Sequence, residues 1–167
     1  IQKCEVTGIL RDGDTVTGVE TSRGTIKAKK VAIVTAGHTS HVAAMAGLRL
    51  PIESFPLQAM VSEPIKPVLD CVVMSGAVHA YISQSDRGEM VMGAGIDHFI
   101  SYTQKSTLAV VEHQMAAVTK LIPILSRLRL MRQWAGIVDT CPDASPIVSK
   151  TPVEGLYVNG GWGTGGF

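Results

Sequence analysis

Glycine dominates the end of the chain. This concentration limits the structures that the segment can form more than any other feature of the sequence does. Five of the seven residues from 160 to 166 are glycine, directly after an apolar stretch at residues 156–158. Glycine permits positive φ angles and lets backbone N–H groups come close to a ligand. A helix beginning beyond residue 167 would add its free N–H groups and positive dipole end. The pattern fits a loop for an anion, or for a ring carbonyl that becomes negative on reduction, and equally a mobile connection or a truncation artefact.

A second strand-to-turn junction lies earlier in the chain. Residues 31–34 form a short continuous apolar run, which is typical of a strand buried on both faces. The run leads into Ala36 and Gly37 and then into a helix expected over residues 39–45, with a stop at Gly47. Such a turn can bring the backbone close to a cofactor, although α/β proteins more often use glycine there for packing.

Strand signals recur on both sides of this junction. Residues 1–30 carry turn signals between β-branched runs and predict a three-stranded meander. Residues 78–83 and 89–93 flank a Ser-Asp-Arg-Gly turn and predict a hairpin. The side-chain period of two places His79 and Tyr81 on one face of the first hairpin strand, where a packed or hydrogen-bonded role is favoured over a catalytic one.

One long amphipathic helix is predicted after the hairpin. Its apolar stripe recurs at spacings of three and four residues, at Leu108, Val111, Met115, Val118, Ile122 and Leu125. Pro123 should end or kink this helix, because proline lacks the N–H donor and clashes with the preceding turn. The helix, the earlier strands and a last strand pair near residues 147–148 and 155–159 together predict a mixed α+β or α/β fold.

Composition narrows the classes of function. The chain has 15 lysines and arginines against 14 acidic residues, a formal charge of +1, which argues against a surface for nucleic acid or anionic membranes. No run of about 18 apolar residues is present to span a membrane. The three cysteines are odd in number and widely spaced, and the five histidines lack metal-ligand spacing. We therefore expect a metal-free protein of a reducing, cytoplasmic compartment.

Few side chains form a catalytic pattern in the sequence. Asp139 and Asp143 could act as paired carboxylates, although residues 143–146 fit a turn equally well. Cys141 has no neighbouring base that would make it a nucleophile. Because the chain begins without Met and stops in a glycine-rich turn, we expect it to be an internal piece of a longer protein.

Five segments spread along the chain can be compared with known proteins. They are residues 55–63 (FPLQAMVSE), 93–97 (GAGID), 136–139 (GIVD), 143–147 (DASPI) and 158–167 (VNGGWGTGGF). In this order, the segments resemble the D-amino-acid oxidase-like FAD-dependent oxidoreductases, and within that family the β subunits of heterotetrameric sarcosine oxidases. The resemblance implies part of a dinucleotide-type FAD-binding domain and an antiparallel-sheet substrate domain that carries the long helix.

The resemblance also divides the chain. Residues 1–45 are expected to be the later part of the FAD-binding domain, and residues 46–134 the substrate domain. Residues 135–167 then return to the FAD-binding domain and carry the flavin loop. The family's G-x-G-x-x-G turn and the histidine that tethers FMN are both expected upstream of residue 1.

Site residues are carried over by position. The backbone of Val6 is expected to meet the adenine, Ala36 and Gly37 to pass near the FAD pyrophosphate, and Tyr81 to be a catalytic residue on the substrate side. Hydrogen-bond donors at the pyrimidine edge of the flavin suit the negative charge that reduction places there. The loop residues expected at that edge are Gly161, Trp162, Gly163, Thr164, Gly165 and Gly166.

The implied activity is that of a flavin-dependent amine oxidase. The full-length protein would oxidise sarcosine to glycine, with formaldehyde or methylene-tetrahydrofolate and hydrogen peroxide as the other products. FAD is the expected cofactor, FMN and tetrahydrofolate belong to the full assembly, and the partners are the other sarcosine oxidase subunits. The alternatives are a related FAD enzyme acting on dimethylglycine, glycine or an opine, or a non-catalytic flavin-carrying subunit. We expect the 167 residues alone to be inactive.

Overall fold

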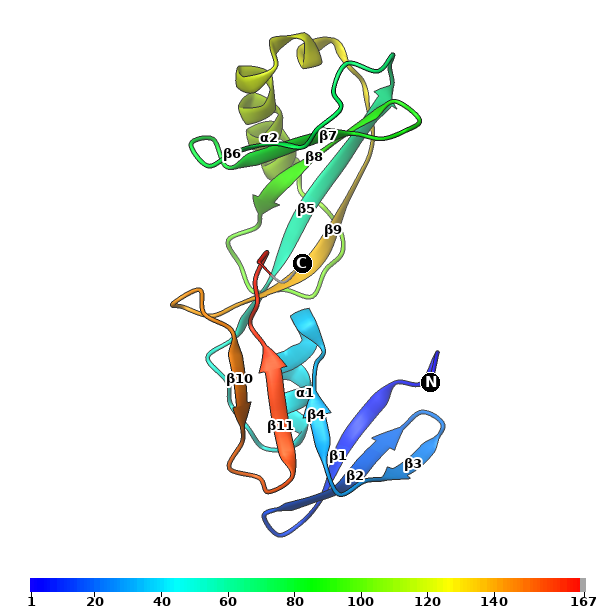
Figure 1. The fold of residues 1–167 in the computed structure, drawn as a ribbon, viewed down its shortest axis with the longest axis vertical. Helices are drawn as coiled ribbons and strands as arrows, with labels where there is room; N and C mark the ends of the chain where they lie inside the picture. Colours follow the sequence, from blue (N-terminus) through cyan, green and yellow to red (C-terminus); the bar gives the residue numbers. More distant parts are fainter. Residues whose placement is uncertain (166–167) are drawn as a thin grey trace. The chain divides into compact units, whose positions relative to one another are not determined.

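The computed structural model describes residues 1–165, apart from the side chain of Ala94. These residues form two compact units (Figure 1). The first comprises Ile1–Ser54 and the described chain from Val138 onward, and the second is Phe55–Ile137. The predicted divisions were at residues 45/46 and 134/135, and the assignment of these parts to FAD and to substrate stays a prediction.

The first sheet of the first unit is an antiparallel meander. It contains β1 (Val6–Asp12), β2 (Thr15–Thr21) and β3 (Gly24–Lys27), in that order. Gly13 has a φ of +56° in the turn between β1 and β2, a conformation that favours glycine. The meander expected from the first thirty residues is therefore confirmed.

The second sheet of this unit is partly parallel. In it β4 (Val31–Ile33) pairs in parallel with β11 (Leu156–Gly160), and β11 pairs antiparallel with β10 (Ile147–Lys150). Of the apolar run that predicted β4, only Ile33 is buried, whereas Val34 is 62% exposed. The expectation that β4 is buried on both faces is therefore wrong. Within residues 1–165, β4 pairs with one strand, β11, and lies at the edge of its sheet.

One short helix follows β4. The 3-10 turn η1 (Ala36–His38) leads into α1 (Thr39–Met45), whose bounds match the predicted helix. Gly47 ends it with a φ of +72°, and the N–H of Leu48 donates to the carbonyl of Ala43 at 3.1 Å. The core of this unit joins both sheets to α1 and consists of Ile9, Val16, Ile33, Ala43, Ala46, Val153, Leu156 and Val158.

The second unit is a five-stranded sheet with one helix against it. The helix α2 (Leu108–Leu121) packs on β8 and β7 and ends two residues before Pro123, which begins the 3-10 helix η2 (Pro123–Arg127), as predicted. The core between sheet and helix includes Met60, Ile82, Met90, Met92, Val118 and Leu125. The strand order is β6 (Val73–Ser75), β7 (Ala80–Gln84), β8 (Glu89–Ile96), β5 (Glu53–Pro64) and β9 (Leu130–Thr140).

The predicted hairpin is present as β7 and β8. The turn between them closes when the N–H of Gly88 donates to the carbonyl of Ser85 at 2.9 Å. His79, however, has a φ of +48° and precedes β7, so the expectation that it shares a strand face with Tyr81 is wrong. A left-handed residue cannot continue the extended backbone of a strand.

Candidate functional site

Two segments that the sequence singled out follow the carboxyl ends of neighbouring parallel strands. Val158 of β11 lies opposite Ile33 of β4, and both strands run in the same direction (Figure 1). The turn with Ala36 and Gly37 follows β4, and the glycine-rich loop follows β11. Open α/β sheets bind ligands at this edge of parallel strands, so the fold brings the two predicted cofactor segments to a suitable place.

Thr39 connects the two segments. Its side chain is fully buried, and its hydroxyl donates to the carbonyl of Ala36 at 2.7 Å. The same side chain lies against Gly160, where a Cβ would stand 2.6 Å from the Thr39 hydroxyl oxygen. Glycine at position 160 is therefore required by packing between the two strand ends, a requirement that the repeated glycines did not reveal.

The turn after β4 has a strained backbone. Ala36 is exposed and has a φ of +45°, which residues with a Cβ rarely adopt. Gly37 is buried, and its carbonyl accepts a hydrogen bond of 2.7 Å from the buried hydroxyl of Ser54. The bonds from Thr39 and Ser54 hold this turn in place, and such over-determined strain is typical of ligand-contacting turns.

The glycine-rich loop is held by Asp139 near the end of β9. The N–H of Gly161 donates to the Asp139 carboxylate, and the N–H of Gly163 donates to the Asp139 carbonyl at 2.7 Å. The N–H of Gly165 donates to the carbonyl of Trp162 at 3.1 Å. Three of the N–H groups expected to face a ligand are thus bonded within the chain, whereas those of Trp162 and Thr164 donate no hydrogen bond to residues 1–165.

Two glycines of this loop have left-handed backbones. Gly161 has a φ of +77°, and a Cβ there would collide with the sulfur of Cys141. Gly163 has a φ of +58°, but no atom lies closer than 3.9 Å to the place of its Cβ. Position 161 therefore needs glycine for both packing and conformation, and position 163 for conformation alone. Gly166, also predicted in this site, lies outside the described residues.

Trp162 is the large side chain of the loop. Its ring N–H donates to the side-chain oxygen of Asn159 at 2.6 Å, and the side chain is 44% exposed. The bond fixes the indole while leaving part of its surface open. An exposed, oriented indole beside two N–H donors is suited to a planar aromatic ligand.

The remaining predicted site residues lie elsewhere. Val6 begins β1 in the meander sheet and is half-buried. Tyr81 belongs to the second unit, on β7, and burial raises the pKa of its phenol above the usual value. Neither residue belongs to the pair of strand ends described above.

The carboxylates considered as a pair have different surroundings. Asp139 is only 3% exposed, whereas Asp143 is exposed and accepts a hydrogen bond of 3.1 Å from the N–H of Ser145 in a turn. Burial, together with the charges of Asp143 and Asp139, raises the pKa of the buried Cys141 thiol. The turn interpretation of residues 143–146 is confirmed, and Cys141 has the surroundings of a packed thiol rather than a nucleophile.

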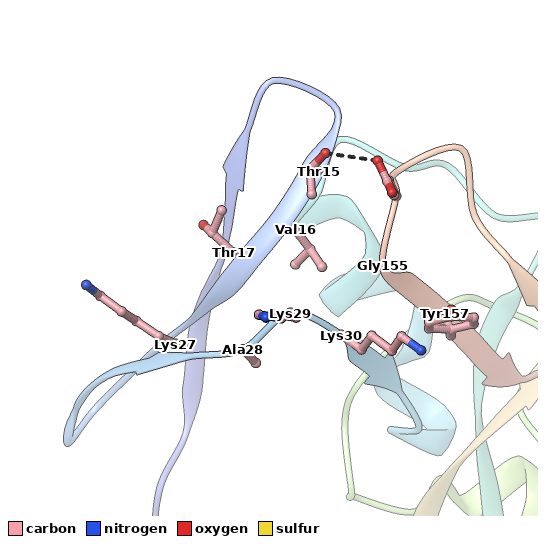
Figure 2. A pocket seen from close by; sticks show the side chains of 10 residues that line it. Thr15, Val16, Thr17, Lys27, Ala28, Lys29, Lys30, Gly155 and Tyr157 are labelled. Atoms are coloured by element: carbon pink, nitrogen blue, oxygen red, sulfur yellow. Dashed lines mark hydrogen bonds between the residues drawn. The ribbon is translucent and has the colours of Figure 1, made fainter.

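A cavity of about 700 Å³ opens at the opposite, amino-terminal ends of β4 and β11 (Figure 2). Figure 2 shows Lys30 extending toward Tyr157, whereas Lys27 points away from the other side chains. The hydroxyl of Thr15 donates to the Glu154 carboxylate at 3.3 Å across its rim. The cavity is separate from the predicted cofactor segments, and its lining residues are Thr15, Val16, Thr17, Lys27, Ala28, Lys29, Lys30, Glu154, Gly155 and Tyr157.

Metal and membrane signals are missing from the described chain. Residues 1–165 hold no group of three or more His, Cys, Asp or Glu side chains placed to bind a metal ion. None of the helices in that range is both long and apolar enough to cross a bilayer.

The whole chain, residues 1–167, matches the family model of the FAD dependent oxidoreductases called DAO. The chain belongs to this family of FAD-dependent oxidoreductases. It is 59% identical over its full length to the sarcosine oxidase subunit beta of an Arthrobacter species and 57% identical to that of Rhodobacter capsulatus. It spans only 41% and 40% of the lengths of these two relatives.

Solved structures agree with this placement. The L-proline dehydrogenase of P. horikoshii superposes with a TM-score of 0.88 at 29% identity, covering 98% of this chain and 45% of that one. The glycine oxidase of Geobacillus kaustophilus superposes with a TM-score of 0.82 at 21% identity, covering 96% of this chain and 43% of that one. The second likeness concerns the fold alone.

The residues at the two strand ends fit the FAD that the family requires. The loop after β11 offers the N–H groups of Trp162 and Thr164, with no acidic side chain among residues 160–165. Trp162, which carries one of these donors, is 44% exposed, so this part of the loop is accessible to a ligand. Sequence reasoning missed the role of Asp139, although a carboxylate inside the run AGIVDTC was a signal of a buried, hydrogen-bonded charge.

Proposed function

We propose that the full-length protein is an FAD-dependent amine oxidase that converts sarcosine to glycine. The identity of 59% to a sarcosine oxidase subunit beta, over the whole of this chain, supports the choice of substrate. The pairing of the β4 and β11 carboxyl ends, each followed by a predicted cofactor segment, is the structural observation that supports it. FAD held at these strand ends would supply the two-electron oxidation of the N-methyl group. Water would then release formaldehyde from glycine, or tetrahydrofolate would take up the one-carbon unit, and oxygen would receive the two electrons as hydrogen peroxide.

The loop after β11 would bind the polar edge of the flavin. The N–H groups of Trp162 and Thr164 are its available donors toward that edge. Preformed donors stabilise charge that develops during reaction without reorganisation at that moment. The backbone of Val6 would meet the adenine, and the held turn at Ala36 and Gly37 would pass near the pyrophosphate.

Tyr81 would contact the substrate. A phenol with the usual pKa of about 10 is protonated at neutral pH, and burial raises the pKa of Tyr81 further, so its hydroxyl is able to donate a hydrogen bond to the substrate carboxylate. This role makes Tyr81 the candidate catalytic residue of the chain.

The full assembly includes further components in this proposal. The name shared by the relatives, subunit beta, supports a hetero-oligomer with other sarcosine oxidase subunits. FMN and tetrahydrofolate would serve that assembly as second flavin and one-carbon acceptor. We place the enzyme in the cytoplasm, which fractionation of cells expressing the full-length protein would test.

Anaerobic mixing of the full-length, FAD-loaded protein with single amines tests the proposal. We expect sarcosine to bleach the visible flavin absorbance faster than dimethylglycine, glycine or an opine, and readmitted oxygen to yield hydrogen peroxide. Added tetrahydrofolate should lower the free formaldehyde released. Faster bleaching by glycine would favour a glycine oxidase, a relative at 29% identity, and no bleaching by any amine would favour a flavin-carrying subunit.

A further inference from the structure

Asp139 is a buried carboxylate with no cationic partner in the described chain. Its exposed fraction is 3%, and the ion pairs found among residues 1–165 are Arg11 with Asp14 and Arg87 with Glu89. A buried carboxylate without a cation is costly unless N–H or O–H groups bond to it. The N–H of Gly161 supplies such a bond.

The same residue binds the loop twice. Its side chain accepts the N–H of Gly161 and its main-chain carbonyl accepts the N–H of Gly163, while the next residue, Thr140, pairs with Trp162. Both glycines have positive φ angles. Glycine adopts negative φ about as readily, so a glycine-rich segment needs a restraint to stay in this conformation. Asp139 therefore supplies the restraint that selects this loop conformation.

The bonding pattern also orients the intervening residue. The N–H of Gly163 bonds to the carbonyl of Asp139, so Thr140 and Trp162 form the non-hydrogen-bonded kind of antiparallel pair. In such a pair the N–H of each residue points away from the opposite strand. The N–H of Trp162 is thus directed away from β9 and remains available for a ligand.

We propose that Asp139 is a positioning residue for the cofactor loop, holding Gly161 and Gly163 so that the N–H of Trp162 is directed at the flavin. The flavin part of this inference rests on the proposed function. The restraint on the loop does not, because it involves residues of this chain alone. Asp139 itself would touch neither flavin nor substrate.

Hydrogen–deuterium exchange of the full-length protein tests the restraint without reference to catalysis. In the Asp139→Ala variant, we expect the amides of residues 159–165 to exchange about tenfold faster, because one hydrogen bond and its buried acceptor are lost. Asp139→Asn keeps an acceptor oxygen and should restore most of the protection. The control is Asp143→Asn, an exposed carboxylate four residues away, which should leave exchange in this segment unchanged.

Flavin binding provides the second readout. We expect Asp139→Ala to raise the FAD dissociation constant about tenfold and to shift the bound-flavin spectrum, with Asp139→Asn close to wild type. If Asp139→Ala does not fold, slow exchange at Gly161 and Gly163 in the wild type, together with near-normal FAD affinity of Asp139→Asn, supports the proposal. Fast exchange at those amides overturns it.

The outcomes separate this inference from the proposed function. Unchanged exchange in Asp139→Ala overturns the restraint, whatever the wild type does with sarcosine. Faster exchange with unchanged FAD affinity and spectrum overturns the positioning role, while wild-type bleaching by sarcosine leaves the proposed function intact. Wild-type protein that binds FAD but is not reduced by any amine contradicts the proposed function, and the exchange and affinity data still decide the role of Asp139.

Discussion

The ring of Tyr81 lies across the backbone of Gly93 on the adjacent strand. The two residues are paired in the antiparallel ladder between β7 and β8. A Cβ at position 93 would stand 2.6 Å from the Tyr81 hydroxyl oxygen and 2.8 Å from two ring carbons. Gly93 thus sets the position of the candidate catalytic tyrosine, because only a residue without a Cβ leaves room for this ring.

Replacing Gly93 with alanine should displace the Tyr81 ring. We expect Gly93→Ala to lower the free energy of unfolding by about 1–3 kcal/mol, since the added methyl group overpacks a buried position. Chemical denaturation of the full-length protein measures this loss. The control is Gly76→Ala, where nothing lies within 4 Å of the added Cβ, and an equal loss in both variants would contradict the explanation.

Tyr81 should make stability fall at alkaline pH. Burial raises the pKa of its phenol above the usual value, so the unfolded chain loses this proton at lower pH than the folded chain does. The contribution is fully present below the unfolded-state pKa of about 10 and is lost as pH rises through the folded-state value. Urea midpoints between pH 8 and about 11 should therefore fall less in Tyr81→Phe than in the wild type, and parallel curves would refute the prediction.

Alanine at Gly161 should be more harmful than alanine at Gly163. Both positions have positive φ, which costs a residue with a Cβ roughly 1–2 kcal/mol, but only position 161 adds a collision with Cys141. We expect losses of unfolding free energy of about 2–4 kcal/mol for Gly161→Ala and about 1–2 kcal/mol for Gly163→Ala. Thermal and urea unfolding of the full-length protein provide the measurement.

A double variant separates the two causes at position 161. Cys141→Ala removes the sulfur that the new methyl group would meet, so Gly161→Ala combined with it should recover the collision part of the loss. The interaction energy from this cycle should be about 1 kcal/mol or more. Strict additivity would mean that backbone conformation alone explains the requirement for glycine.

Cys141 should resist alkylation in the folded protein. Burial and the nearby charges of Asp143 and Asp139 raise the pKa of this thiol, and the thiolate is the reactive form. Iodoacetamide at neutral pH should therefore label the exposed Cys71 much faster, with the difference lost in denaturant. Peptide mass spectrometry measures both rates, and equal labelling in the folded state would argue against this burial.

Local chemistry made several elements predictable from the sequence. The helix at residues 39–45 and its stop at Gly47, the end of α2 before Pro123, and the hairpin around Ser85 and Gly88 depend on turn residues and short-range periodicity, and all are present. The family was also accessible, because its sequence segments are long and occur in order. Predictions of this kind succeed where neighbours in the chain determine the backbone.

Other features depended on partners distant in the chain. The run at residues 31–34 looked buried on both faces, but its burial depends on how many strands and helices lie beside β4. The buried Gln58 bonds to Asp97 and to Thr107, which lie 39 and 49 positions further along the chain, so no local pattern signals these bonds. Burial is a property of the assembled layers, and short-range sequence carries little information about it.

The residue pattern alone is enough to locate the glycines, the main turns and the two α-helices, and to assign the family. The roles of the glycines follow from packing between distant segments: Gly160 makes room for Thr39, Gly161 for Cys141, and Asp139 bonds to the loop from 22 positions away. This difference arises because φ preference and periodicity are encoded residue by residue. Close approach and the hydrogen bonding of a buried carboxylate, in contrast, exist only once separate strands pack together.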